Sequence, residues 1–344
     1  MFYKKKILVL ITALSVLLTG CASISQSISK ITPKKTEKNA LSGREGTNGP
    51  VLVVKVDDTN SAHPQIGLED ADVVYIEQVE GGLTRLAAVF SSIIPTRIGP
   101  VRSARISDID ILRQYGRVAF AYSGAQRKLL PVIAAAYLQN LGAQAQSPTI
   151  YTTDPNRVQP YAMVLRADLL MAKTVENNYQ IDRAGSVGWN FGSAPDGGKE
   201  VSMVALHWPA AGYKATWSPE EKRWLLMHNS KINLAESGKV LGPTTLVIQL
   251  VSITPSEYHD KVGGITPFSQ TVGVGRGYIL RDGKSFEANW SRPTPESGTN
   301  WSLADGTAVN FAPGQVWVAL TDNEPTFTYV VATPSASASP AKSK

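Results

Sequence analysis

The sequence predicts an α+β protein in which an α/β domain over residues 49–184 precedes a mostly antiparallel β domain over residues 199–332. Two patterns lead to this prediction. In the first domain, short β-rich runs alternate with helical ones, an order typical of layered α/β structures whose strands are partly parallel. In the second, strand-like runs follow one another with turn signals between them. A chain of 344 residues that is 43% hydrophobic is long enough for one large domain or two ordinary ones.

The first domain is expected to contain three strands and three helices. Residues 51–56 are apolar except for Lys55, which is typical of a buried strand. Apolar residues recur near helical spacing between Ile106 and Leu112, and Pro131 interrupts an otherwise apolar helical run. The expected strands are 51–56, 72–79 and 83–90, and the expected helices are 105–117, 125–141 and 166–178.

The second domain is expected to be built from strands, reached through a connector over residues 185–198. Asp282-Gly283 is a good two-residue hairpin turn because both positions tolerate positive φ. The expected strands are 201–208, 213–217, 223–227, 244–253, 278–280, 285–290, 316–320 and 327–331.

The N-terminus has the features of a lipoprotein signal peptide over residues 1–21. Three lysines precede an apolar run, residues 7–18, that is too short to span a bilayer comfortably but fits a secretory signal. It ends in Leu18-Thr19-Gly20-Cys21, which resembles the lipobox of bacterial lipoproteins. We therefore expect lipidation of Cys21, by palmitate or a similar acyl chain, and a lipid-anchored protein at the extracytoplasmic face of the cell membrane.

The cysteine count and the charge distribution exclude several classes of function. Cys21 is the single cysteine, so cysteine catalysis and cysteine metal sites are excluded once it is lipidated. The net charge of +6 comes from the chain's ends, because residues 49–333 contain 24 Lys and Arg against 26 Asp and Glu. We therefore expect no nucleic-acid partner. Residues 22–48 are polar and basic and predict a flexible tether beside the membrane, and residues 333–344 predict a disordered tail.

Two unusual runs identify a family resemblance. They are Glu80-Gly81-Gly82-Leu83-Thr84-Arg85 and Gly99-Pro100-Val101-Arg102-Ser103-Ala104-Arg105, and the second half adds Gly273-Val274-Gly275-Arg276-Gly277 and Pro313-Gly314-Gln315-Val316-Trp317. Together they resemble the YerB-like (DUF3048) family of bacterial lipoproteins over residues 50–322. The resemblance implies a DUF3048 N-terminal-like α/β domain and a DUF3048 C-terminal-like β domain, and it brings no established reaction. Where the family has a proline-histidine-asparagine motif, this chain reads Gln159-Pro160-Tyr161-Ala162.

Charge is segregated around these runs. Seven acids and no Lys or Arg lie between residues 57 and 80, and eight bases against two acids lie between residues 85 and 128. One interpretation is internal pairing, with arginine forks holding carboxylates. The other is an anion-binding site, in which Ser103 caps a helix that starts near residue 105. The residues predicted for that site are Arg85, Arg97, Arg102, Ser103 and Arg105.

No catalytic constellation is specific. Glu80 with Asp57 or Asp58 is the candidate pair for glycoside hydrolysis, which needs two carboxyl groups. Asp57 and Asp58 end the first strand, where α/β proteins often place ligands, but no histidine or carboxylate spacing indicates a metal. His228 is the best general-base candidate, although a loop histidine without a role is the more common case. We therefore predict no metal and no cofactor.

The sequence thus predicts an extracytoplasmic, membrane-anchored lipoprotein of unknown molecular activity. It favours a non-enzymatic function over an enzymatic one. We expect it to bind a cell-wall component, such as an anionic wall polymer, or a wall-synthesis protein of the envelope. The alternative is a cell-wall-active hydrolase that uses Glu80 with Asp57 or Asp58.

Overall fold

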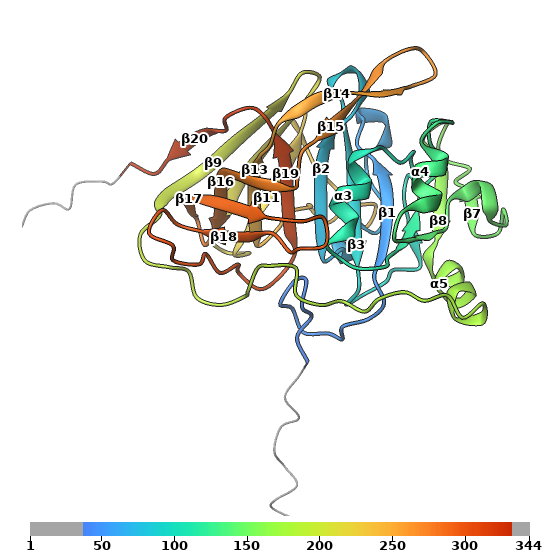
Figure 1. Ribbon diagram of the computed structural model, residues 1–344. Coiled ribbons are helices and arrows are strands. Elements are labelled where there is room, and N and C mark those ends of the chain that lie inside the picture. The colour runs from blue at the N-terminus through green and yellow to red at the C-terminus, as the bar shows by residue number, and fades with distance from the viewer. Residues whose placement is uncertain (1–36, 332–344) are drawn as a thin grey trace, which may run out of the picture. The chain divides into compact units, whose positions relative to one another are not determined.

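The computed structural model describes residues 37–331, and residues 38–331 belong to one compact unit (Figure 1). The predicted signal peptide with Cys21, the first part of the predicted tether and the predicted C-terminal tail lie outside the described residues. Among residues 37–331, no helix is long and apolar enough to cross a membrane.

Strands dominate the described chain, as predicted for its second half. Residues 37–331 contain three α-helices, each shorter than the helix predicted for that part of the first half: α3 (Ser107–Arg113), α4 (Leu130–Ala135) and α5 (Ala167–Glu176). Four short 3-10 helices are η1 (Asn60–Ala62), η2 (Leu68–Asp70), η3 (Glu80–Gly82) and η4 (Ala143–Ala145). The strands are β1 (Leu52–Asp57), β2 (Val73–Gln78), β3 (Thr84–Phe90), β4 (Arg97–Ile98), β5 (Ala119–Ala121), β6 (Gln139–Asn140), β7 (Tyr151–Thr153), β8 (Met163–Arg166), β9 (Lys199–Trp208), β10 (Ala211–Ser218), β11 (Arg223–His228), β12 (Lys231–Ile232), β13 (Thr245–Leu250), β14 (Ile253–His259), β15 (Ile265–Ser269), β16 (Gly273–Arg281), β17 (Lys284–Arg292), β18 (Asn300–Ser302), β19 (Val316–Thr321) and β20 (Thr326–Tyr329).

One large sheet runs through both predicted halves of the chain. Its order is β12-β11-β10-β9-β17-β16-β13-β19-β2-β3-β1-β5-β6, with β18 on β17 and β20 on β9. The halves join where β19 pairs in parallel with β2, so that Val316 lies opposite Val73. The two halves therefore share backbone hydrogen bonds, and the predicted domain boundaries remain a prediction.

Strand β1 lies in the interior of this sheet and is buried on both faces, as its apolar run predicts. It pairs with β3 in antiparallel and with β5 in parallel fashion. Its alternate residues enter two hydrophobic clusters, one that includes Leu170 of α5 and one that includes Ile111 of α3 and Ile133 of α4. The sheet thus separates two layers of core.

Lys55 interrupts the apolar run of β1 and is fully buried. Its ammonium forms ion pairs with Glu77 of β2 and, at 2.8 Å, with Asp108 of α3, and both carboxylates are also fully buried. We call these three residues the Lys55 cluster. It connects α3 to the centre of the sheet.

Three sequence predictions need correction. The helix predicted for residues 125–141 spans only Leu130–Ala135, because Pro131 stands at its first turn and Gln139 leaves it to pair beside β5. Residues 38–48, which the sequence assigns to the tether, belong to the folded unit, since Leu41 is fully buried and the Ser42 hydroxyl donates a hydrogen bond of 2.6 Å to Asp72.

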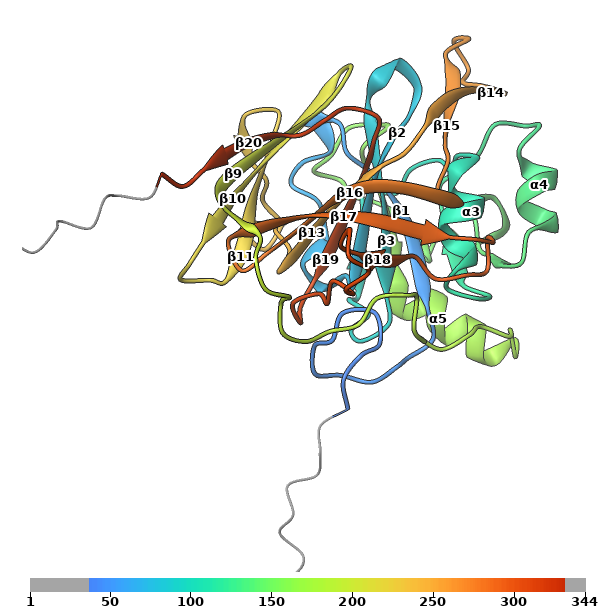
Figure 2. The ribbon, with the colours of Figure 1, turned by 60° about the vertical axis from the view of Figure 1, so that its left-hand side comes forward.

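The third correction concerns the hairpin β14–β15, which forms a separate two-stranded sheet. It stands out in orange at the top of Figures 1 and 2. The sequence did not predict it, because Pro255 and Pro267 disfavour a strand within a large sheet. The predicted hairpin at Asp282-Gly283 is present between β16 and β17, with φ of 52° and 73° at the two turn residues.

Candidate functional site

The tip of the β14–β15 hairpin, the η3–β3 segment and the loops around residues 102–105 and 125–127 enclose a pocket of about 670 Å³. Such a volume is ordinary for a ligand site. Most of the predicted site residues lie in its wall. We call it the arginine pocket, and define it by its charged residues and one serine: Glu80, Arg85, Arg102, Ser103, Arg105, Arg127, Asp260 and Lys261.

Arg105 forms a bidentate pair with Glu80. Its Nε lies 2.7 Å from Oε1 of Glu80, and its Nη2 donates to Oε2 at 2.7 Å. Thr266 of β15 donates a further hydrogen bond to Oε1. Burial works to raise the pKa of the Glu80 carboxyl, but the hydrogen bonds and charge of Arg105 together with Thr266 outweigh it and lower that pKa. Glu80 is therefore an ionised carboxylate held by donors.

Arg102 pairs with the second candidate acid. Its guanidinium forms an ion pair with Asp57, whose side chain is buried at the end of β1. The other Asp57 oxygen accepts hydrogen bonds of 2.8 Å from the backbone and the hydroxyl of Thr59. The guanidinium carbon of Arg102 also lies 5.8 Å from the centre of the Tyr161 ring, in the segment where the family motif differs.

Arg85 differs from these two arginines. Its Nη1 donates to the backbone oxygen of Ser103 at 3.1 Å, and within residues 37–331 no carboxylate lies at ion-pair distance. Burial, followed by the positive charges of Arg105 and Arg102, lowers the pKa of Arg85 to about 10. It is a half-buried cation, still charged at neutral pH, whose charge the described chain leaves without a directly paired acid.

Two predicted site features lie elsewhere. Arg97 is exposed on β4, outside the pocket wall, and its guanidinium lies 3.3 Å from Glu236 and 3.6 Å from Asp154. Ser103 does not cap a helix, because α3 begins at Ser107 and the residue before it, Ile106, provides no side-chain cap. The predicted convergence of Arg97 with Arg102 is therefore wrong, and the predicted cap is wrong.

Both interpretations of the charge segregation find support in different residues. Arg97, Arg102 and Arg105 are paired internally, as the first interpretation predicts. Arg85, together with the exposed Arg127 and Lys261, supplies the positive charge that the second requires.

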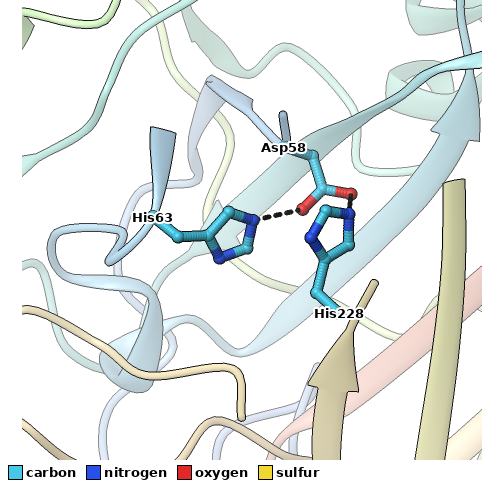
Figure 3. A group of neighbouring side chains, drawn as sticks. All are labelled: Asp58, His63 and His228. Carbon is cyan, nitrogen blue, oxygen red and sulfur yellow. Dashed lines mark ion pairs between the residues drawn. The ribbon is translucent and has the colours of Figure 1, made fainter. Parts of the chain in front are cut away.

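A second group of polar side chains lies beside Asp58. His63, which follows η1, and His228, at the end of β11, point toward its carboxylate (Figure 3). The Nε2 atoms of His63 and His228 lie 3.4 Å and 3.8 Å from the two Asp58 oxygens, and the imidazole rings stack with centroids 4.5 Å apart. We call these three residues the histidine cluster.

The histidine cluster is buried, and this affects its protonation. Asp58 and His228 are 1% and 3% exposed. Burial, only partly offset by the charge of Asp58, lowers the pKa of His228, so its imidazole is neutral at pH 7. Burial works to raise the pKa of Asp58, but the hydrogen bond from His63 and the charges of His228 and His63 outweigh it and lower that pKa.

The sequence pointed to Asp58 and His228 separately but not to this cluster. His63 and His228 are far apart in the chain, and only the pairing of β10 with β9 and β11 brings His228 to the end of β1. The spacing of residues in the sequence cannot predict that two such distant histidines lie side by side.

The comparisons with known proteins cover most of the chain. Residues 36–180 match the model described as "Protein of unknown function (DUF3048) N-terminal domain", and residues 204–318 match that of its C-terminal domain. The chain is 36% identical over 291 residues to "Putative lipoprotein YerB" of Bacillus subtilis (strain 168), an alignment that covers 84% of each chain. The crystal structure of YerB from Bacillus subtilis shares the fold, with a TM-score of 0.74 at 18% identity over 85% of this chain and 99% of that one.

Proposed function

The chain belongs to the DUF3048 family, and from this premise we propose that it is a lipoprotein that binds an anionic cell-wall polymer in the arginine pocket. We propose further that Cys21 anchors it to the extracytoplasmic face of the cell membrane. The lipobox-like sequence and the name of the Bacillus relative support the anchor. In this account residues 49–184, as the α/β part, and residues 199–332, as the β part, are two domains that share one sheet.

The observation that carries the binding proposal is the state of Arg85. A half-buried cation without a directly paired acid is less favourable than a fully solvated one, because burial removes part of its water and only more distant acids compensate for the loss. An anion in the pocket would supply the missing partner. Guanidinium groups suit this purpose, since their planar forks match phosphate and carboxylate oxygens.

The charge of the whole pocket supports the same ligand class. Its wall contains five cationic side chains against two acidic ones, and Glu80, one of the two, is already occupied by Arg105. Arg127 and Lys261 are exposed at the rim, where they would attract an extended polyanion. A wall-synthesis protein with an acidic surface is the other partner that this charge would fit.

The alternative function, a cell-wall-active hydrolase, has less support. One of its two carboxyl groups must stay protonated to act as the general acid. The pKa values of Glu80 and Asp58 are both lowered by their donors, and Asp57 is paired with Arg102. Release of wall fragments by the wild type, lost in Glu80→Gln, would favour the hydrolase instead.

The test is co-sedimentation of the full chain, in detergent, with purified cell walls. Binding should fall between about 0.1 M and about 1 M salt, as the Debye length shrinks from about 10 Å to about 3 Å. Arg127→Ala/Lys261→Ala removes two exposed rim charges and should weaken binding about 5- to 30-fold, or about 1–2 kcal/mol. The matched control is Lys128→Ala/Lys214→Ala, which removes two exposed charges outside the pocket wall.

Equal binding by the rim variant and the control would contradict the proposal, because it would make the arginine pocket irrelevant to the wall. If the wild type fails to bind walls at low salt, the polymer is not the ligand. A search for an acidic protein partner would then follow.

A further inference from the structure

The histidine cluster brings three metal-ligating groups to one point. The potential ligand atoms of Asp58, His63 and His228 all lie within 4.8 Å of one another. They come from the end of β1, the segment after η1 and the end of β11, so the fold holds each on a different element (Figure 3). Two imidazoles and one carboxylate are a common protein ligand set for Zn²⁺ and for other divalent transition metals.

The hydrogen bonds of the described chain leave one ligand atom of the cluster without a partner, whereas Nε2 of His63 lies 3.1 Å from Nε2 of Gln65 and both oxygens of Asp58 accept hydrogen bonds. The Nε2 atom of His228 is buried and, within the described chain, has no hydrogen-bond partner. Its 3.8 Å separation from Asp58 is too long for a hydrogen bond but spans the space in which a bridging cation would sit. Buried polar atoms normally have hydrogen-bond partners. An imidazole nitrogen that lacks one and faces a carboxylate therefore indicates that a cation binds between the two groups.

The groups around the cluster orient its members as outer partners of metal ligands do. Nδ1 of His63 lies 3.1 Å from Oδ1 of Asn233, and its Nε2 lies 3.4 Å from Asp58 and 3.1 Å from Nε2 of Gln65, so that both ring nitrogens are held in place. Tyr213 and Thr84 donate hydrogen bonds of 2.7 Å and 2.5 Å to Asp58. Such partners fix the tautomer and rotamer of metal ligands.

From this geometry we infer that Asp58, His63 and His228 form a binding site for a divalent transition-metal ion. The three side chains supply three ligands, and the side of His63, whose side chain is 17% exposed, gives the ion a route to and from solvent. The site is separate from the arginine pocket, whose wall includes none of the three. The inference stands whether or not the pocket binds a wall polymer.

The competing explanation is a structural network in which His63 and His228 only pack against Asp58. The two explanations differ in a direct measurement, titration of the metal-free full chain in detergent with Zn²⁺ by calorimetry. The metal site predicts saturable binding of one ion per chain. Co²⁺ in its place should give the visible absorption bands of a low-coordinate complex, which a packing role would not produce.

Variants at the cluster and at a distant histidine sharpen the test. His63→Ala removes the ligand nearest to solvent and should weaken Zn²⁺ binding by more than about 100-fold, while Asn233→Ala, which removes only an outer partner, should weaken it by about 10- to 100-fold. His207→Ala is the matched control, since His207 is exposed on β9 and lies outside the cluster. It should leave the affinity unchanged.

Binding should also weaken at acidic pH, because protons compete with the metal for imidazole nitrogen. Circular dichroism would verify that each variant is folded. A folded wild type that binds no ion, or that binds it equally well as His63→Ala, would overturn the inference and leave the histidine cluster as a packing arrangement.

Discussion

The Lys55 cluster and the arginine pocket handle buried charge in opposite ways. Lys55 is enclosed by two carboxylates, and all three side chains are sealed from solvent. In the arginine pocket the cations outnumber the acids, the cavity opens to solvent, and Arg85 has no paired acid within residues 37–331. A buried cation that is paired with acids can stabilise the fold. A cation beside a cavity that has no paired acid can instead pair with an anionic ligand.

The largest effect on stability is expected from removing the cation of the Lys55 cluster. Lys55→Met leaves Glu77 and Asp108 buried without their cation and should lower the free energy of unfolding by about 3–5 kcal/mol in urea denaturation. Lys55→Met/Glu77→Met also removes one of the two unpaired acids and should restore part of the lost free energy of unfolding. A single variant that is as stable as the wild type would show that the Lys55 cluster does not stabilise the fold.

The same region should give stability a particular pH dependence. Burial, and next the charge of Asp108, raise the pKa of Glu77 to about 7 from an ordinary value of 4.5. A raised pKa means that the folded state holds this proton more tightly, so the contribution of Glu77 is complete below about pH 4.5 and is lost as the pH rises toward 7.

Urea unfolding at several pH values would measure this contribution. Glu77→Gln keeps the shape of the side chain and removes the titration, so the decrease in stability between pH 5 and pH 7 should be smaller in the variant. Parallel curves for the two proteins would contradict the assignment.

A smaller effect is expected from the Arg105–Glu80 pair of the arginine pocket. Arg105→Ala leaves Glu80 nearly buried and unpaired, and should lower the free energy of unfolding by about 1–3 kcal/mol. Arg105→Ala/Glu80→Ala should cost less than the sum of the two single changes, because the partners are in contact. Additive losses in this double-mutant cycle would show that the pair contributes nothing to stability.

Local sequence patterns predicted much of the fold. The apolar run of β1 and the Asp282-Gly283 turn each depend on neighbouring residues, and both are present as predicted. The pairing of β19 with β2 and the hairpin β14–β15 depend on contacts between distant segments, and no short-range pattern reports these.

The sites divide in the same way. The charge segregation indicated that acids and arginines would meet, but it left open which arginines would be paired. The structure answers this through geometry: Arg102 and Arg105 form ion pairs with acids, whereas within residues 37–331 Arg85 donates its hydrogen bond to a backbone oxygen. The histidine cluster depends on His228, which is distant in sequence from Asp58 and could not be placed beside it without the sheet order.

The measurement that tests the central claim most directly is made on Arg85→Gln. If Arg85 is a cation without a paired acid that serves a ligand, its removal should leave the free energy of unfolding unchanged or raised, because a half-buried charge without a paired acid is lost. The same variant should bind cell walls at least about 30-fold more weakly, since an interaction of about 2–5 kcal/mol with the bound anion is lost. A variant that is strongly destabilised yet binds walls like the wild type would contradict the account, because Arg85 would then serve the fold and not a ligand.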